Sequence, residues 1–266
     1  RVAPSFIRFG HFELPAARQD ITLLRQFAEF TIRHYFSDLL TPEESTGKAP
    51  LSAKTLLAFY QRVVSSTAQL INEWMRVGFV HGVLNTDNLP IHGLTIDYGP
   101  YGWLEAYDES WTPNTTDFRQ HRYAFGNQPR IGLWNLAQLG NSLYPLIKDV
   151  DALQSVLNSY IDEYSKLEQQ RFRDKLGLLS TQDTDEEMFK QLTQNLCAGA
   201  YDYTLFFRML GSIEFTNTEE SIASALKTLK KAQYEQGNNQ GADEAMYAWL
   251  SHYAQRLDQE YVLLGR

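Results

Sequence analysis

Three side chains that end in oxygen atoms, Asp87, Asn88 and Asp97, lie close together in the sequence. Magnesium is a hard cation that prefers oxygen ligands, usually one or two from protein and the rest from phosphate and water. We therefore expect Asn88 and Asp97 to hold magnesium. Asp87 is the nearest spare carboxylate and could act as a general base. A plainer alternative is that Asp87 and Asn85 only hydrogen-bond the backbone of their own loop.

The residues before Asn88 resemble a nucleotide-binding loop that lacks one group. Many kinase-like phosphotransferases have His-Gly-Asp followed by Asn and then a short strand ending in Asp-Phe-Gly or a variant, and the first Asp is the base. Here the order is His81-Gly82-Val83. Val83 cannot accept a proton, so the pattern favours magnesium-nucleotide binding and argues against ordinary γ-phosphoryl transfer. We expect His81 to stabilise the loop, not to act as a ligand or base.

Apolar residues recur at helical spacing over most of the chain. Asp20 and Ser52 are typical N-caps, and Gly78 is a typical C-terminal glycine, which predicts two helices before the His81 loop. Further helices are expected from residue 131, with Trp134 in the core, and over 150–176, 185–210 (one helix or a pair broken near Gly199), 218–234 and 241–260, with a break at 237–241.

Other segments are expected to be irregular or extended. Residues 1–15 are predicted to be extended, 41–50 to form a surface loop, and 89–96 to form a tight hairpin that brings Asn88 and Asp97 together. Residues 99–129 show no periodicity and are a candidate substrate surface, although packing of their aromatic side chains is the plainer role. The fold class is therefore mainly α with a short β-hairpin at the active-site loop, like the C-terminal lobe of a protein kinase.

Composition limits the possible partners. The net charge of −8 argues against nucleic-acid binding, and no apolar run reaches the length of a membrane span. No signal peptide is apparent, and a cytoplasmic protein is expected, or a mitochondrial one if the source is eukaryotic. Cys197 is the only cysteine, and we expect it to be buried and inert. No glycine-rich phosphate loop precedes His81, so residues 1–266 are expected to be a kinase-like C-lobe with a helical extension, partnered by an N-terminal lobe of the same protein.

Longer blocks carry a family resemblance. The chain resembles the selenoprotein O family of kinase-fold proteins in residues 1–13, 81–88, 93–102, 122–129, 134–136, 202–204 and 207–210. The resemblance implies a pseudokinase that binds ATP in a flipped orientation with magnesium, or with manganese as the alternative metal, and transfers AMP to Ser, Thr or Tyr hydroxyls of protein substrates. It also implies that Asp87 is the base, that Asn88 and Asp97 bind the metal, and that Arg1 and Arg8 contact the ATP phosphates.

Two other functions stay open from the residues alone. One is a small-molecule kinase of the aminoglycoside or choline type with Asp87 as a displaced base, although such kinases place base and Asn several residues apart. The other is a nucleotide-binding scaffold without turnover.

Overall fold

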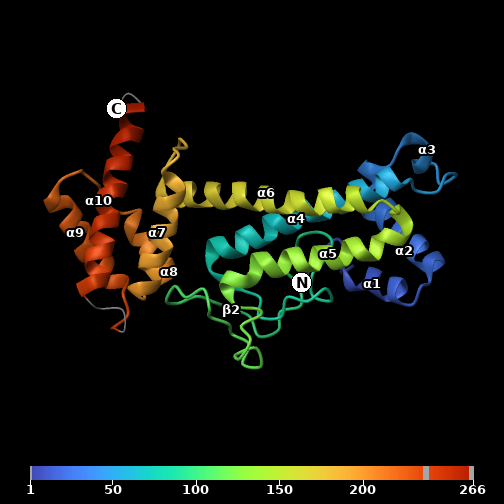
Figure 1. Ribbon diagram of the computed structural model, residues 1–266, viewed down its shortest axis with the longest axis horizontal. Helices are drawn as coiled ribbons and strands as arrows, with labels where there is room; N and C mark the ends of the chain where they lie inside the picture. The colour runs from blue at the N-terminus through green and yellow to red at the C-terminus, as the bar shows by residue number, and fades with distance from the viewer. Residues whose placement is uncertain (1, 236–239, 264–266) are drawn as a thin grey trace.

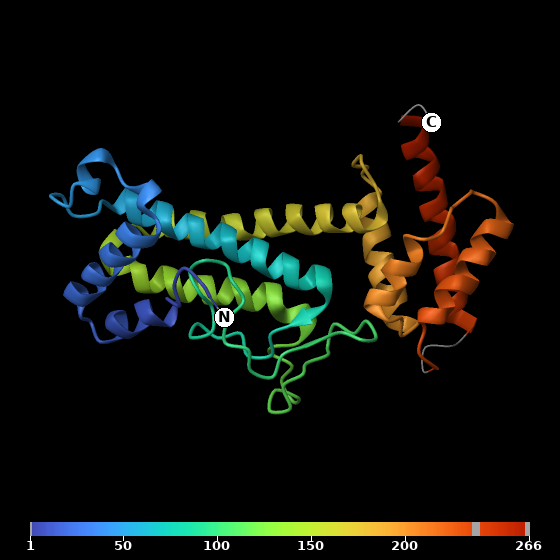
Figure 2. The same cartoon turned by 180° about the vertical axis from the view of Figure 1, so that it is seen from behind.

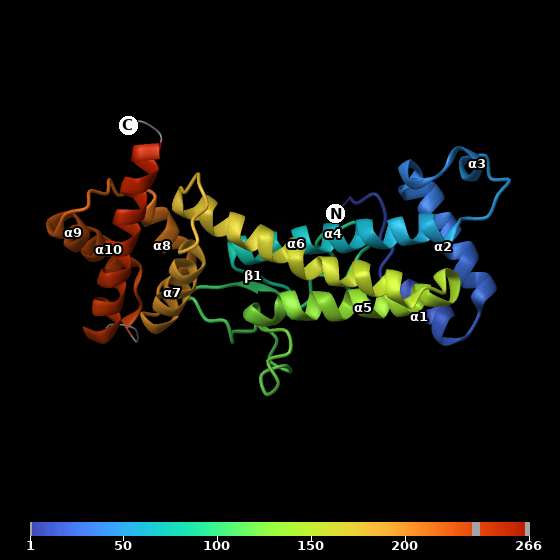
Figure 3. The ribbon, with the colours of Figure 1, turned by 45° about the horizontal axis from the view of Figure 1, so that its top comes forward.

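The computed structural model describes residues 2–235 and 240–263, and it is mainly helical. Three long helices run side by side along the long axis of the molecule: α4 (Ala53–Val77), α5 (Gln128–Ile147) and α6 (Val150–Leu176) (Figures 1 and 3). At one end lie α1 (Gly10–Ala17), α2 (Ile21–Tyr35) and α3 (Pro42–Ser45). At the other end lie α7 (Asp185–Ala198), α8 (Tyr203–Leu210), α9 (Glu219–Leu229) and α10 (Gln240–Leu263) (Figure 2).

The caps that the sequence predicts are present. The Asp20 carboxylate accepts a hydrogen bond from Leu23 N at 2.9 Å, and the Ser52 hydroxyl accepts one from Thr55 N at 3.2 Å. Gly78 ends α4 with a φ of 70°, a left-handed conformation that glycine adopts without a steric penalty. Residues 150–176 form one helix, and 185–210 form a pair separated around Gly199, as expected. The expected break at 237–241 lies mostly outside the described residues.

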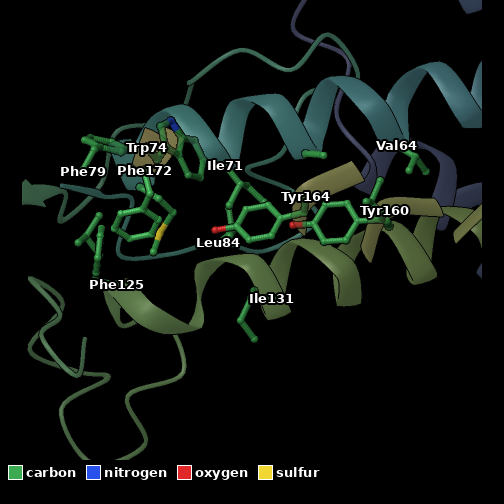
Figure 4. Packing of buried hydrophobic residues seen from close by; sticks show 14 of the residues in the cluster. Val64, Ile71, Trp74, Phe79, Leu84, Phe125, Ile131, Tyr160, Tyr164 and Phe172 are labelled. Carbon is green, nitrogen blue, oxygen red and sulfur yellow. The ribbon is translucent and has the colours of Figure 1, made fainter. Parts of the chain in front are cut away.

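The long helices share one hydrophobic core. Val64, Ile71 and Trp74 of α4 point toward Tyr160, Tyr164 and Phe172 of α6, as Figure 4 shows. Gly132 lets α5 approach α4 closely, because a Cβ there would lie 2.2 Å from Ile71 Cδ1. A larger side chain at this position would force the two helices apart.

A two-stranded antiparallel sheet closes the functional loop. Strand β1 (Phe79–Val80) pairs with β2 (Gly102–Trp103), so the ends of the 81–101 segment are brought together. The expected hairpin at 89–96 is wrong. Residues 89 and 91 pair instead with the N-terminal segment, through Phe9 N to Leu89 O at 3.0 Å and Ile91 N to Ile7 O at 3.1 Å. The backbone that a hairpin would use is therefore already engaged.

Three other expectations are corrected by the structure. Residues 10–17 form α1 and are not extended, because Phe12 and Pro15 bury one helical face. Trp134 is 42% exposed, since it lies on the outer face of α5 beneath the guanidinium of Arg122. Cys197 is exposed, because Leu192 and Leu196 occupy the inward positions of α7.

Carboxamide side chains hold the backbone that leads into the functional loop. Gln128 accepts a hydrogen bond from His81 N at 3.0 Å and donates one to Phe79 O at 2.9 Å. Asn114 donates to Gly82 O at 2.9 Å, and Asn135 donates to Leu84 O at 2.9 Å. Gln128, Asn114 and Asn135 are all buried, so these bonds replace water at backbone groups that lack a helical or sheet partner. We call these three residues the carboxamide clamp.

This arrangement predicts the effect of Asn135→Leu, which keeps the side-chain size but removes both amide donors. The buried carbonyls of Leu84 and Ile131 would lose their Asn135 partner, at a cost of about 1–3 kcal/mol in the free energy of unfolding. Urea unfolding of the complete protein measures this loss. Asn141→Leu, at an exposed position of the same helix, should change the free energy by less than about 0.5 kcal/mol. Equal effects of the two substitutions would contradict the clamp.

Candidate functional site

The loop that carries Asp87 is fastened to the N-terminal segment. Gly10 N donates to Thr86 O at 2.9 Å, and Asn88 N donates to Asn85 O at 3.0 Å within the loop. A Cβ at Gly10 would lie 3.5 Å from Asp87 Cα, so the start of α1 packs directly against the Asp87 backbone. The Asp87 side chain is exposed and makes no hydrogen bond to any described residue. Its carboxylate is therefore available to a substrate, whereas its backbone position is fixed.

Asn88 is oriented by the backbone of Val83. Its Nδ2 donates to Val83 O at 2.8 Å. Val83 thus contributes a backbone carbonyl to the site and no titratable group. With the amide nitrogen engaged, the Asn88 Oδ1 atom is left as a hard oxygen donor for a cation.

Asp97 is paired with Arg8. Arg8 Nε lies 2.5 Å from Asp97 Oδ2, and Arg8 Nη2 lies 2.8 Å from Asp97 Oδ1, which is a bidentate ion pair. The hydrogen bond from Arg8 lowers the pKa of Asp97, so this carboxylate is ionised at neutral pH. Asp97 has a φ of 55°, a conformation uncommon for residues other than glycine and often found at functional sites.

Arg8 also links Asp97 to the Asp87 loop. The backbone of Arg8 pairs with Pro90, two residues after Asn88. The pKa of Arg8 is raised, chiefly by the hydrogen bond to Asp97 and in smaller part by the charge of Asp87. The Arg8 guanidinium therefore bonds to Asp97 and interacts with the charge of Asp87, whose neighbour in the chain is Asn88. Arg1, the other arginine expected to contact phosphates, lies outside the described residues.

His81 supports the loop, as expected. It is buried, its ring stacks on Trp74, and its Nε2 lies 2.9 Å from Ile96 O. Burial lowers the pKa of His81, so the imidazole is neutral and donates its proton to the Ile96 carbonyl. This bond fixes the residue immediately before Asp97.

The donor set fits magnesium. Asn88 Oδ1 and the Asp97 carboxylate supply oxygen ligands only, and each carboxylate oxygen keeps a lone pair while it accepts from Arg8. Two protein ligands suit an ion that retains waters and phosphate oxygens. No cluster of three or more His, Cys, Asp or Glu side chains occurs among residues 2–235 and 240–263, so a closed, all-protein metal cage is not formed there.

Several residues of the site have no clear signal in the sequence. Gln128 and Asn135 lie seven residues apart, on one face of α5, and polar residues at an otherwise buried face could have indicated a role. Tyr123, in the aperiodic segment, donates its hydroxyl hydrogen to Asn85 Oδ1. Asp117 fixes Tyr123 by accepting hydrogen bonds from the backbone of Arg122 and Tyr123, at 3.0 and 2.7 Å.

No helix in the described ranges has both the length and the apolar character that crossing a bilayer requires.

Comparison with known proteins shows the family of the chain. Residues 1–262 match the family described as protein adenylyltransferase SelO. The protein nucleotidyltransferase YdiU of Flavobacterium johnsoniae is 44% identical over 98% of this chain and 48% of that protein. The proteins of the same name from Rhodopirellula baltica and Xanthomonas campestris are 42% and 43% identical, over 97% and 98% of this chain and 48% and 47% of their own lengths. The chain thus spans about half the length of these curated relatives, and with almost all of it matched, it belongs to the SelO family of protein adenylyltransferases.

Proposed function

We propose that the complete protein transfers AMP from ATP to Ser, Thr or Tyr hydroxyls of other proteins, and that this chain forms its kinase-like C-terminal lobe. One observation carries the proposal. The position of the kinase base is held by Val83, which contributes only a carbonyl, while the exposed carboxylate of Asp87 lies next to the oriented Asn88. The names of the relatives, which are protein nucleotidyltransferases, support it.

The chain's residues have distinct roles in this reaction. Asp87 accepts the proton of the substrate hydroxyl, whose oxygen bonds to the α-phosphorus of ATP as the bond to the β-phosphate oxygen breaks and pyrophosphate leaves. Magnesium, when bound by Asn88 and Asp97, neutralises charge on the phosphates. Arg8 exchanges its hydrogen bonds to Asp97 for bonds to phosphate oxygens. His81 and the carboxamide clamp keep the loop in place throughout.

The fate of labelled ATP tests this function. The complete protein is incubated with a cell extract and with ATP labelled at the α- or the γ-phosphate. We expect the α label on protein hydroxyls and no transfer of the γ label. Transfer of the γ label to a small molecule would indicate a small-molecule kinase, and no transfer of either label would indicate a nucleotide-binding scaffold.

The variant Asp87→Asn tests whether AMP transfer depends on the Asp87 carboxylate. The substitution keeps the side-chain size but removes the base, so AMP transfer should fall by roughly 10²–10⁴-fold, as for other general bases. ATP affinity, measured by calorimetry, should hardly change. Asp258→Asn makes the same change at an exposed position of α10 and should leave transfer intact. Full transfer by the Asp87 variant would exclude this carboxylate as the base.

A second prediction concerns Arg8. Removing the guanidinium in Arg8→Ala frees the Asp97 carboxylate for a cation, so affinity for magnesium alone should rise. ATP affinity should fall by roughly 10- to 100-fold, because charged hydrogen bonds to phosphate contribute about 1.5–3 kcal/mol. Calorimetric titration of each ligand in the complete protein measures both changes. Arg18→Ala, at an exposed site after α1, is the control. A parallel fall in both affinities would show that Arg8 only maintains the fold.

A further inference from the structure

Positive charge is concentrated next to the candidate site in an otherwise acidic chain. The chain has a net charge of −8, yet residues 119–130 contain Arg119, Arg122 and Arg130 and no Asp or Glu. None of these three guanidinium groups forms an ion pair with a described residue, whereas Arg8, Arg171 and Arg256 all do. Residues 119–130 therefore carry three arginines without an ion pair to any described residue and no acidic residue of their own.

The segment adjoins the Asp87 loop directly. Tyr123 bonds to Asn85, two residues before Asp87, and Arg122 precedes Tyr123 in the chain. The Arg122 guanidinium lies over the ring of Trp134, 4.6 Å from its centroid, and 5.6 Å from the centroid of Tyr123. These ring contacts hold the cation at the surface beside the loop.

Arg130 extends the same surface along α5. It lies four residues before Trp134, so the two side chains share one face of the helix. It also lies in the first turn of this 20-residue helix, where the helix dipole adds positive potential. We call Arg122, Arg130 and Trp134 the basic platform.

The carboxylates of the neighbouring loop accept hydrogen bonds from other groups and form no ion pair with the platform arginines. Asp117 accepts the backbone N–H groups of Arg122 and Tyr123. Glu109 accepts the hydroxyl of Tyr107 at 2.9 Å, and Asp108 accepts that of Ser110 at 2.7 Å. The guanidinium groups are thus free to pair with an incoming anion.

We propose that the basic platform binds acidic residues that flank the target hydroxyl in the protein substrate, which rests on the function proposed above. Guanidinium groups pair with carboxylates in a bidentate manner, and the exposed face of Trp134 can pack against the neighbouring peptide. Substrate segments rich in Asp or Glu would therefore be preferred. The overall negative charge of the chain favours a short acidic segment over a long polyanion, because a nucleic acid would be repelled beyond the platform.

Binding and transfer are measured separately with synthetic peptides and the complete protein. One peptide pool has Ser, Thr or Tyr at its centre with four flanking Glu residues, and a matched pool has four Gln. A fluorescent Glu peptide with Ala at the centre reports binding by anisotropy without any reaction. The variants are Arg122→Glu and Arg130→Glu, checked for folding by thermal unfolding. Arg18→Glu makes the same charge change at an exposed position directly after α1, outside the platform.

We expect the Glu pool to accept AMP about 10-fold faster than the Gln pool at limiting peptide, with the difference shrinking as salt is raised. Either platform variant should weaken binding of the Ala-centred Glu peptide by about 10-fold and abolish the preference, whereas Arg18→Glu should do neither. Equal AMP transfer to both pools would contradict the proposed role of the platform in substrate binding, but not the proposed AMP-transfer function. Platform-dependent binding without any transfer would support the platform and contradict the proposed function. Equal binding of a 20-nucleotide single-stranded DNA would show that the surface recognises polyanions in general and overturn the inference.

Discussion

The backbone between Phe79 and Leu84 depends on side-chain amides for its hydrogen bonds. Only Phe79 and Val80 have a strand partner, and the groups that follow are buried. Gln128, Asn114 and Asn135 supply the missing partners, and they come from two separate parts of the chain. An unpaired buried backbone group costs about 1–3 kcal/mol, so the loop keeps its shape only while α5 and the 104–127 segment stay in place. The position of Asp87 is thereby linked to the helical core.

Contacts between distant parts of the chain also determine the arrangement around Arg8. The N-terminal segment pairs with residues 89 and 91, which places the Arg8 guanidinium against Asp97 and within electrostatic range of Asp87. Without that guanidinium, Asp97 would lose its ion-pair partner and Asp87 would lose a nearby positive charge. Arg8 thus compensates the negative charge of Asp97, and under the proposed function a magnesium-nucleotide complex would offer both partners of the ion pair new ligands at once.

The sequence predicted those features whose causes are local. Asp20, Ser52 and Gly78 mark helix ends because capping depends on neighbouring residues alone. The roles of Asp87 and Asn88 stay predictions that rest on the loop motif and the family resemblance. The predicted hairpin at 89–96 is wrong because residues 89 and 91 pair with the N-terminal segment, far away in the sequence. The prediction that Trp134 lies in the core is wrong because helical periodicity does not reveal that Arg122 covers this residue on the outer face of α5. The Arg8–Asp97 pair joins residues 89 positions apart, and no spacing rule predicts it. The clamp has only a weak signal in the sequence, namely two polar residues seven positions apart on a helical face that is otherwise buried, and the backbone groups that they bond lie far away in the chain.

The account's central claim is that Asn88 and Asp97 share one cation while Arg8 moves to the nucleotide. A crystal structure of the complete protein with magnesium and a non-hydrolysable ATP analogue tests it most directly. We expect one magnesium ion bound by Asn88 Oδ1 and the Asp97 carboxylate, Arg8 bonded to phosphate oxygens, and the α-phosphate closer to Asp87 than the γ-phosphate. An intact Arg8–Asp97 pair with magnesium bound elsewhere, or a γ-phosphate presented to Asp87, would contradict the account.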